Sequence, residues 1–342
     1  MEWLAEYGLF LAKAVTFLIV VFLVVAMLAA AKDRNKRAEG SLSVVKLNEQ
    51  LQKMTDRLSH AVLDKTALKA RAKVLKAEAK TRSKEEKEGA SRKRSFVLNF
   101  NGDIKASALD NLRQEVTAVL ELATGDDEII VRLESGGGMV HAYGLASAQL
   151  VRIRDAGIPL TVCVDKVAAS GGYMMACIAD RIIAAPFAML GSIGVVAQIP
   201  NFNRLLKKHD VDYEMLTAGE YKRTLTLFGE NTDKGREKFQ EDLETIHRLF
   251  KTFVSQYRPQ LDIDTVATGE VWFGTEALHH ALADQLLTSD QYITGQTRES
   301  DVFEVHYIAR KRLQDKLSSG VSTALDRLLL TWLSRLHNQR FW

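Results

Sequence analysis

Residues that build disulfide or metal frameworks are scarce in this chain. Only two of its 342 residues are cysteine, Cys163 and Cys177. Both fall in segments that we expect to form a core strand and a core helix, which predicts two buried thiols rather than a disulfide. The sequence shows no zinc-ligand spacing and no phosphate-binding glycine loop, so it implies no cofactor and no metal.

Charge is absent from one long run near the N-terminus. Ala14–Ala31 contains no charged side chain, and we expect the apolar segment to cover residues 8–31 because the long Lys13 side chain can reach the membrane interface. About twenty apolar residues span a bilayer. The run therefore predicts a single-pass transmembrane anchor.

A cleaved signal peptide is the competing interpretation of this run. Glu2 and Glu6 stand where a signal peptide has a basic cluster, which favours a retained anchor. The basic residues 32–37 would place the following domain in the cytoplasm, but long domains translocate largely regardless of charge. The side of the membrane therefore stays open.

Aromatic residues are missing where positive charge is concentrated. Residues 32–94 contain 19 Lys and Arg against 9 Asp and Glu, a net charge of +10, whereas the whole chain carries +3. Base stacking needs interleaved aromatic side chains, so this region does not predict a nucleic-acid partner. Attraction to anionic lipid headgroups is the better interpretation for the residues nearest the anchor.

The same basic region has a heptad-like pattern, with alternating spacings of four and three, as in the seam of a coiled coil. One lysine and three alanines weaken this seam. We keep two interpretations: a solvated helical linker between the anchor and the next domain, and a coiled coil through which the chain self-associates. The seam positions are Leu47, Leu51, Met54, Leu58, Ala61, Lys65, Leu68, Ala72, Leu75 and Ala79.

Residues 95–295 are expected to form one α/β domain. Strand and helix patterns alternate along it, and this order predicts helices packed on a mostly parallel sheet. Residues 296–342 predict an amphipathic helical segment that packs on the core, on a partner or at the membrane interface. The expected strands include 96–100, 128–133 and 159–164, and the expected helices include 108–123 and 233–257.

Ser170 is the main candidate for chemistry. It lies between the expected strand 159–164 and an expected helix that begins with Gly171 and Gly172. A serine on a sharp strand-to-helix turn can be exposed as a nucleophile, and a peptide N–H at a helix start can receive an oxyanion. The alternative interpretation is that Ser170 only caps the helix.

Three further turns accompany Ser170. Ser135-Gly-Gly-Gly138 follows an expected strand, where backbone N–H groups can approach a bound carbonyl. Gly191-Ser-Ile-Gly-Val195 supplies a second polar turn, and Gly219-Glu-Tyr-Lys-Arg223 supplies a lysine. Together with Ala168-Ala-Ser-Gly-Gly-Tyr173, these motifs closely resemble the signal peptide peptidase A family of membrane serine proteases, in its SohB-type branch. The resemblance covers roughly residues 95 to 290.

The resemblance implies a ClpP/crotonase-like βα superhelix and a Ser-Lys dyad. By resemblance, Ser170 is the nucleophile and Lys222 the general base. The oxyanion donors would be the backbone amides of Gly137 and Gly171, and Ser192 would hold Lys222 in place. A lysine can serve as a base where burial lowers its pKa far below about 10.4, the solution value.

The resemblance also implies partners. It predicts hydrolysis of peptide bonds through an acyl-enzyme, with cleaved signal peptides or other membrane-derived fragments as substrates. It predicts a bacterial cytoplasmic (inner) membrane location and a homo-oligomer in which a neighbouring chain can complete the dyad.

Three alternatives remain. A Ser-His-Asp triad needs a histidine, but none occurs between Ser170 and Arg204, which leaves His141 and His209. A crotonase-type enzyme of acyl-CoA chemistry would use paired carboxylates near the site. A catalytically inactive scaffold would use the fold for assembly alone. The acidic residues that border the expected cleft are Glu134, Asp165 and Asp180.

Overall fold

The computed structural model describes residues 13, 16–17, 40–87 and 92–309. The predicted anchor lies almost entirely outside this part of the chain, as does most of the predicted C-terminal helical segment. Where that segment is described, the prediction of a helix is wrong for residues 301–308, which form a strand. Among the described helices, none combines the length and the apolar character that crossing a bilayer requires.

The chain divides into two compact units. The smaller contains residues 1–42 and 307–342, and the larger contains Ser43–His306. Within the smaller unit, the Tyr307 hydroxyl accepts the Gly40 N–H at 2.9 Å. The larger unit carries almost all of the described secondary structure and all of the candidate site residues.

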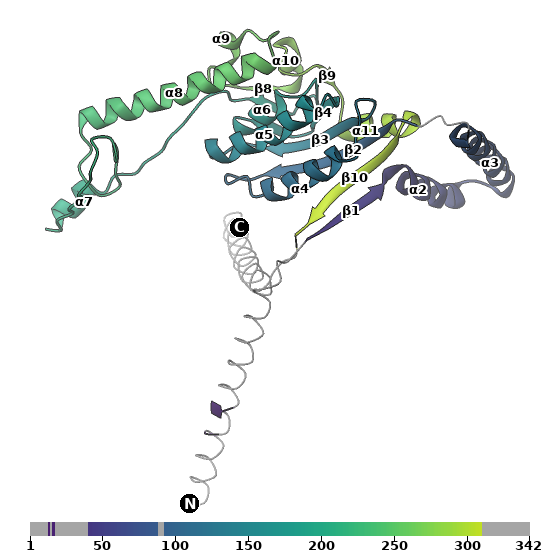
Figure 1. Ribbon diagram of the computed structural model, residues 1–342, viewed down its shortest axis with the longest axis horizontal. Helices are drawn as coiled ribbons and strands as arrows, with labels where there is room; N and C mark the ends of the chain where they lie inside the picture. The colour runs from purple at the N-terminus through teal and green to yellow at the C-terminus, as the bar shows by residue number, and fades with distance from the viewer. Residues whose placement is uncertain (1–12, 14–15, 18–39, 88–91, 310–342) are drawn as a thin grey trace, which may run out of the picture. The chain divides into compact units, whose positions relative to one another are not determined.

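The described strands form one sheet (Figure 1). They are β1 Ser41–Lys46, β2 Arg94–Gly102, β3 Glu128–Ser135, β4 Leu160–Val164, β5 Val167–Ala169, β6 Arg181–Ala184, β7 Met189–Gly191, β8 Val271–Phe273, β9 Gln285–Leu286 and β10 Asp301–Ile308. The order is β1-β10-β2-β3-β4-β6-β9, with β5 beside β3 and β7, and β8 beside β7. From β10 to β9 the pairings are parallel, as are those of β5, whereas β8 is antiparallel to β7. The prediction of an α/β fold with a mostly parallel sheet is confirmed.

Helices cover both faces of the sheet. Because side chains alternate along a strand, Leu98 of β2 lies in a large core together with residues of α4, α5, α6 and α8, and Val97 lies in a smaller core closed by Tyr292 of α11 and Leu47 of α2. The two cysteines are free and buried, as predicted. The helices are α2 Leu47–Val62, α3 Lys65–Lys87, α4 Leu109–Leu120, α5 Val140–Asp155, α6 Gly171–Ala176, α7 Asn203–Lys208, α8 Asp233–Tyr257, α9 Ile263–Val266, α10 Gly274–His279 and α11 Ser289–Glu299.

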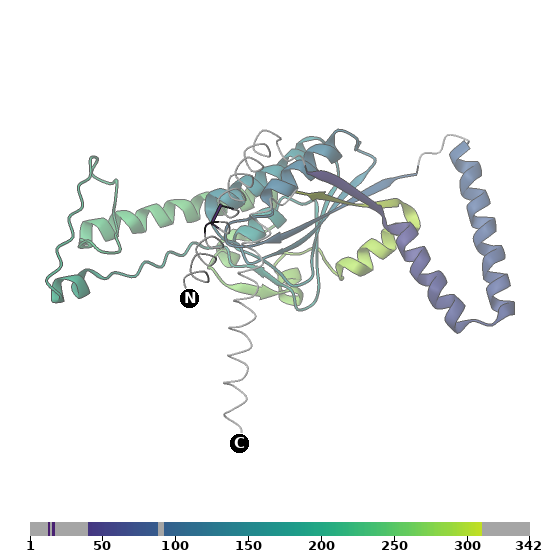
Figure 2. The same ribbon diagram turned by 90° about the horizontal axis from the view of Figure 1, so that it is seen from below.

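The helical region before β2 is a hairpin, which corrects the expectation of a seam along one helix. α2 ends at Val62 and α3 begins at Lys65, because the Asp64 carboxylate accepts the Ala67 N–H at 2.7 Å and so caps α3. The two helices then run antiparallel, side by side (Figures 1 and 2).

The apolar residues of α2 do not pack between the two helices of this hairpin. Met54, Leu58 and Val62 are 59%, 65% and 71% exposed, and they lie on one side of α2 because they are four residues apart. One ion pair joins the two helices, with Arg71 3.8 Å from Asp56. Two of the expected seam positions, Met54 and Leu58, thus lie on an exposed apolar stripe of α2, whereas Leu51, Leu68 and Leu75 are half-buried.

A second projection, which we call the arm, consists of residues 196–232 and the N-terminal half of α8. α8 extends beyond the sheet, and α7 lies near its outer end (Figure 1). The arm folds on itself: Phe202 N–H donates to Leu227 O at 2.7 Å, and the Phe202 and Phe228 rings are 6.1 Å apart. Its surface retains apolar side chains, among them Leu216 at 95% exposure.

An ion pair made by the buried Arg258 fixes the C-terminal end of α8 against the sheet. Arg258 is 2% exposed and donates to both oxygens of Asp284, at 2.9 and 2.8 Å, and to Ala281 O at 2.6 Å. Asp284 also accepts the Ile182 N–H of β6 at 2.7 Å. One guanidinium thus ties α8, the loop after α10 and the sheet together.

Removing the carboxylate of this pair should strongly destabilise the fold. Asp284→Ala leaves the Arg258 charge buried without its partner, and we expect a loss of about 3–5 kcal/mol in the free energy of unfolding. Urea denaturation measures it. As a matched control, Glu220→Gln breaks an exposed pair with Lys234 and should leave the midpoint unchanged; equal midpoints for the two variants would contradict this role.

Candidate active site

Ser170 lies between β5 and α6 in a conformation that few residues adopt. Its φ of 53° and ψ of −120° turn the chain sharply, at a cost on the order of 1–3 kcal/mol for a residue with a Cβ. The turn is held on both sides, because Ser170 N–H donates to Gly191 O at 2.8 Å and Ser170 O accepts from Met174 N–H at 3.0 Å. The backbone therefore presents a half-buried serine at the start of a helix.

Two details of this turn differ from the sequence expectations. The strand that leads into Ser170 is β5, because the chain leaves β4 at Val164 and forms a separate short strand beside β3 and β7. Ser170 also occupies the N-cap position of α6, yet its side chain makes no capping hydrogen bond. The capping interpretation thus leaves the strained turn unexplained.

The triple-glycine turn lies against the Ser170 turn. Gly137 has a φ of +85°, and a Cβ on it would lie 2.7 Å from Gly171 N and 2.8 Å from the Ser170 Cβ. A Cβ on Gly172 would lie 2.4 Å from Ser135 O. Glycine is required at these positions because the two backbones touch. The structure thus brings Gly137 and Gly171 together beside Ser170.

Ser192 lies next to the same turn. It follows Gly191, whose carbonyl accepts the Ser170 N–H, and it has a φ of 49°. Its own N–H donates to Glu270 O at 2.6 Å. Parallel pairing of Ala169 with Gly191 therefore brings a second serine to the site.

Lys222 does not contact Ser170 within the chain. It lies in the arm, in the segment that connects α7 to α8, and its side chain is exposed. Its backbone N–H donates to Gly219 O at 3.2 Å, but in the described part of the chain its amine makes no hydrogen bond or ion pair. The predicted base and nucleophile come from different parts of the larger unit.

The three candidate carboxylates take part in structural contacts. Asp165 accepts both the N–H and the hydroxyl of Ser289, and Asp180 accepts the Leu160 N–H. Glu134 pairs with Lys166 at 3.0 Å. These interactions hold strand ends, and none of them directs a carboxylate pair at Ser170.

The fold brings one histidine near this region that the sequence does not single out, His247. It projects from α8, and its Nε2 lies 3.2 Å from Ile193 O, one residue after Ser192. Only the packing of α8 on the glycine turn reveals this proximity, so no local sequence signal could have found it.

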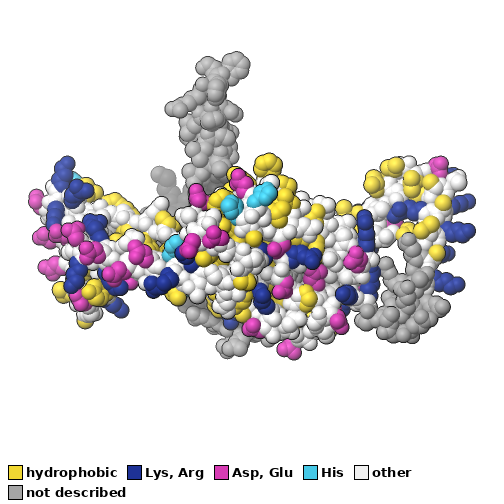
Figure 3. All heavy atoms as spheres, turned by 90° about the horizontal axis from the view of Figure 1, so that it is seen from above, with side chains coloured by type: hydrophobic (Ala, Val, Ile, Leu, Met, Phe, Trp, Pro, Cys, Tyr) yellow, Lys and Arg dark blue, Asp and Glu magenta, His cyan; other side chains and the backbone are white. Residues whose placement is uncertain are grey.

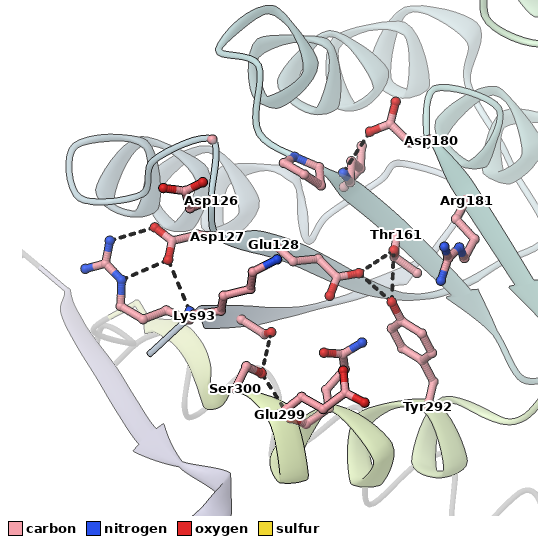
Figure 4. A pocket seen from close by; sticks show the side chains of 16 residues that line it. Lys93, Asp126, Asp127, Glu128, Thr161, Asp180, Arg181, Tyr292, Glu299 and Ser300 are labelled. Carbon is pink, nitrogen blue, oxygen red and sulfur yellow. Dashed lines mark hydrogen bonds and ion pairs between the residues drawn. The ribbon is translucent and has the colours of Figure 1, made fainter. Parts of the chain in front are cut away.

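A polar pocket of about 400 Å³ opens at the opposite edge of the sheet (Figure 4). Its lining includes the first residues of β2, β3, β4 and β6, whereas Ser170 follows the carboxyl end of β5. Inside it, Glu128 accepts hydrogen bonds from Thr161 and Tyr292, and burial raises the pKa of Tyr292 to about 12. This pocket is separate from the turns around Ser170.

Two family models together match most of the chain. The model "Peptidase family S49 N-terminal" matches residues 2–150, and the model "Peptidase family S49" matches residues 152–302. The chain belongs to peptidase family S49. The resemblance drawn from the four motifs is thereby confirmed.

Named relatives agree with this assignment. The chain is 48% identical over 322 residues to "Probable protease SohB" of Haemophilus influenzae, covering 92% of this chain and 91% of the relative. It is 44% identical to the protein of the same name from Buchnera aphidicola subsp. Acyrthosiphon pisum, covering 96% and 97%. The family and these relatives support a serine protease function.

A solved structure was also matched. The 1510-N membrane-bound stomatin-specific protease in complex with a substrate peptide aligns with a TM-score of 0.41 and 14% identity, over 68% of this chain and 99% of that chain.

The contact between the two turns predicts opposite effects for two glycines. Gly137→Ala should abolish peptidase activity and destabilise the fold, because its Cβ would overlap Gly171 N and its φ of +85° strains an alanine. Gly144→Ala in α5 meets open space and should keep activity and gain about 0.5–1 kcal/mol in the free energy of unfolding. Peptide hydrolysis and thermal unfolding test both variants; an active Gly137→Ala enzyme would rule out the close approach.

Proposed function

We propose that the protein is a serine endopeptidase in which Ser170 is the nucleophile and Lys222 the general base. The observation that carries the proposal is the strained Ser170 turn, held against two glycine backbones at a helix start. Strained residues persist where the surrounding structure over-determines them, and they cluster at active sites. The parallel sheet and these turns also support the ClpP/crotonase-like superhelix.

The chemistry is acyl transfer in two steps. Ser170 Oγ attacks the scissile carbonyl carbon and passes its proton to the neutral Lys222 amine, which then protonates the leaving amine. A water molecule next attacks the ester carbonyl and gives a proton to the same lysine, which passes it to Ser170 Oγ as the C–O bond breaks and the acid leaves. The N–H of Gly171 would stabilise the oxyanion of both tetrahedral intermediates by about 3 kcal/mol. The predicted second donor, Gly137, gives its N–H to Ser135 Oγ at 3.1 Å, so its peptide would have to turn to reach the oxyanion.

In this proposal, Lys222 reaches the nucleophile only when several copies of the chain assemble. The arm leaves it exposed and also carries exposed apolar side chains such as Leu216 and Tyr221, a surface typical of an interface. A homo-oligomer in which the arm of one chain packs on the next would bury Lys222 beside a neighbouring Ser170. The Ser192 turn would then receive and orient the amine.

The hairpin of α2 and α3 is the second surface to which we assign the binding of a partner. Residues 47–87 carry 11 Lys and Arg against 6 Asp and Glu, a net charge of +5, and basic and apolar side chains gather on this end of the molecule (Figure 3). With the apolar stripe of α2, this surface suits self-association or contact with anionic lipid. It fits a protease anchored by residues 8–31 in a bacterial inner membrane.

The proposed substrates are extended, membrane-derived peptides such as cleaved signal peptides. An extended peptide binds chiefly through its backbone, which suits a site lined by glycine turns. The catalytically inactive scaffold is the second candidate function, and it predicts that Ser170 is dispensable.

Labelling with a serine-directed phosphonate tests the dyad. Wild-type protein should gain one adduct on Ser170, mapped by mass spectrometry, and both Ser170→Ala and Lys222→Ala should lose it. His247→Gln is the control for another base and should label normally. Labelling that survives Lys222→Ala but fails in His247→Gln would replace the dyad with a histidine mechanism.

Mixing the two inactive variants tests whether the dyad forms between chains. A Ser170→Ala chain supplies an intact Lys222, and a Lys222→Ala chain supplies an intact Ser170. Co-assembled, they should regain phosphonate labelling, confined to the Lys222→Ala chain. If wild type is labelled but the mixture stays unlabelled after subunit exchange is verified, the dyad forms within one chain.

A further inference from the structure

Tyr143 and Ser135 form a buried hydroxyl pair beneath the triple-glycine turn. Tyr143 of α5 is 0% exposed, and Ser135, the last residue of β3, is 2% exposed. Their oxygens lie 2.5 Å apart. The reaction described above uses neither side chain, although both touch the backbone on which it depends.

The neighbouring carbonyl sets the direction of these hydrogen bonds. Tyr143 O–H donates to Asp103 O at 2.8 Å, so the proton between the two hydroxyls comes from Ser135. The Ser135 oxygen in turn accepts the Gly137 N–H at 3.1 Å. A single chain of donors therefore runs from Gly137 through Ser135 and Tyr143 to Asp103.

The ring of Tyr143 supports the second turn. A Cβ on Gly171 would lie 2.4 Å from Tyr143 Cγ, so the ring packs directly on the Gly171 backbone. A Cβ on Gly102 would lie 2.5 Å from the Tyr143 hydroxyl, which leaves that hydroxyl little room to move. Burial raises the pKa of Tyr143 above its ordinary value, so the hydroxyl remains a donor at neutral pH.

We propose that Tyr143 is a positioning residue for the Ser170 site. Its hydroxyl, through Ser135, holds the triple-glycine turn that lies against Ser170 and Gly171, and its ring backs the Gly171 peptide. This inference rests on the proposed function, in which Ser170 is the nucleophile and the Gly171 N–H receives the oxyanion. Preorganised donors act mainly on the transition state, so the loss of the hydroxyl should lower kcat and leave KM unchanged.

The experiment compares Tyr143→Phe with Tyr173→Phe. Tyr173 is equally buried, and its hydroxyl donates to another backbone carbonyl, Leu282 O, at 3.1 Å. Both variants should lose similar thermal stability. Tyr143→Phe should lower kcat about tenfold, and the rate of phosphonate labelling by the same factor, whereas Tyr173→Phe should keep both. Equal kcat losses in the two variants would reduce Tyr143 to a structural role.

The Ser135→Ala variant tests whether Tyr143 and Ser135 act through one chain of hydrogen bonds or make independent contributions. If Tyr143 acts through Ser135, the double variant should lose no more kcat than the more impaired single variant. Losses that multiply would overturn the relay.

Phosphonate labelling of the wild type distinguishes a failure of this inference from a failure of the proposed function. If the phosphonate does not modify Ser170 in the wild type, the proposed function fails. If it modifies the wild type and Tyr143→Phe at equal rates, only the positioning role fails.

Discussion

The candidate site depends on the contact between two backbone turns. These turns lie closer together than side chains would permit. The triple-glycine turn at Gly137 and the turn at Ser170 meet at distances where a Cβ would overlap a backbone atom. This contact holds Ser170 in its strained conformation at the start of α6. Buried side chains beneath them, chiefly Tyr143 and Ser135, fill the space that the glycines leave.

The contact itself depends on a parallel sheet. Ser135 pairs with Ala168, and Ala169 pairs with Gly191, so β3, β5 and β7 deliver three distant turns to one edge. Ladder hydrogen bonds and the buried core offset the strain at that edge, which is why unusual backbone conformations concentrate there. The ion pair of Arg258 with Asp284 anchors the end of α8 to the same structure.

Local patterns predicted much of this arrangement. The helix expected at 233–257 is α8. The three expected strands lie within β2, β3 and β4, except that the strand expected to begin at Pro159 begins at Leu160. Glycine motifs identified the turns because only glycine fits such contacts. Tertiary effects escaped prediction: β10 forms because β2 offers it an edge, and the capping carboxylate of Asp64 splits the seam into a hairpin. The exposure of Lys222 on the arm depends on packing that no local pattern encodes.

The central claim is that assembly completes a Ser-Lys dyad at the Ser170 turn. The most direct measurement is an experimental structure of the assembled protein with a phosphonate bound at the site. The account predicts phosphorus bonded to Ser170 Oγ, its oxyanion facing the Gly171 N–H, and the amine of Lys222 within about 3 Å of Ser170 Oγ. A phosphonate bonded elsewhere, or Ser170 paired with another base while Lys222 stays in solvent, would contradict it.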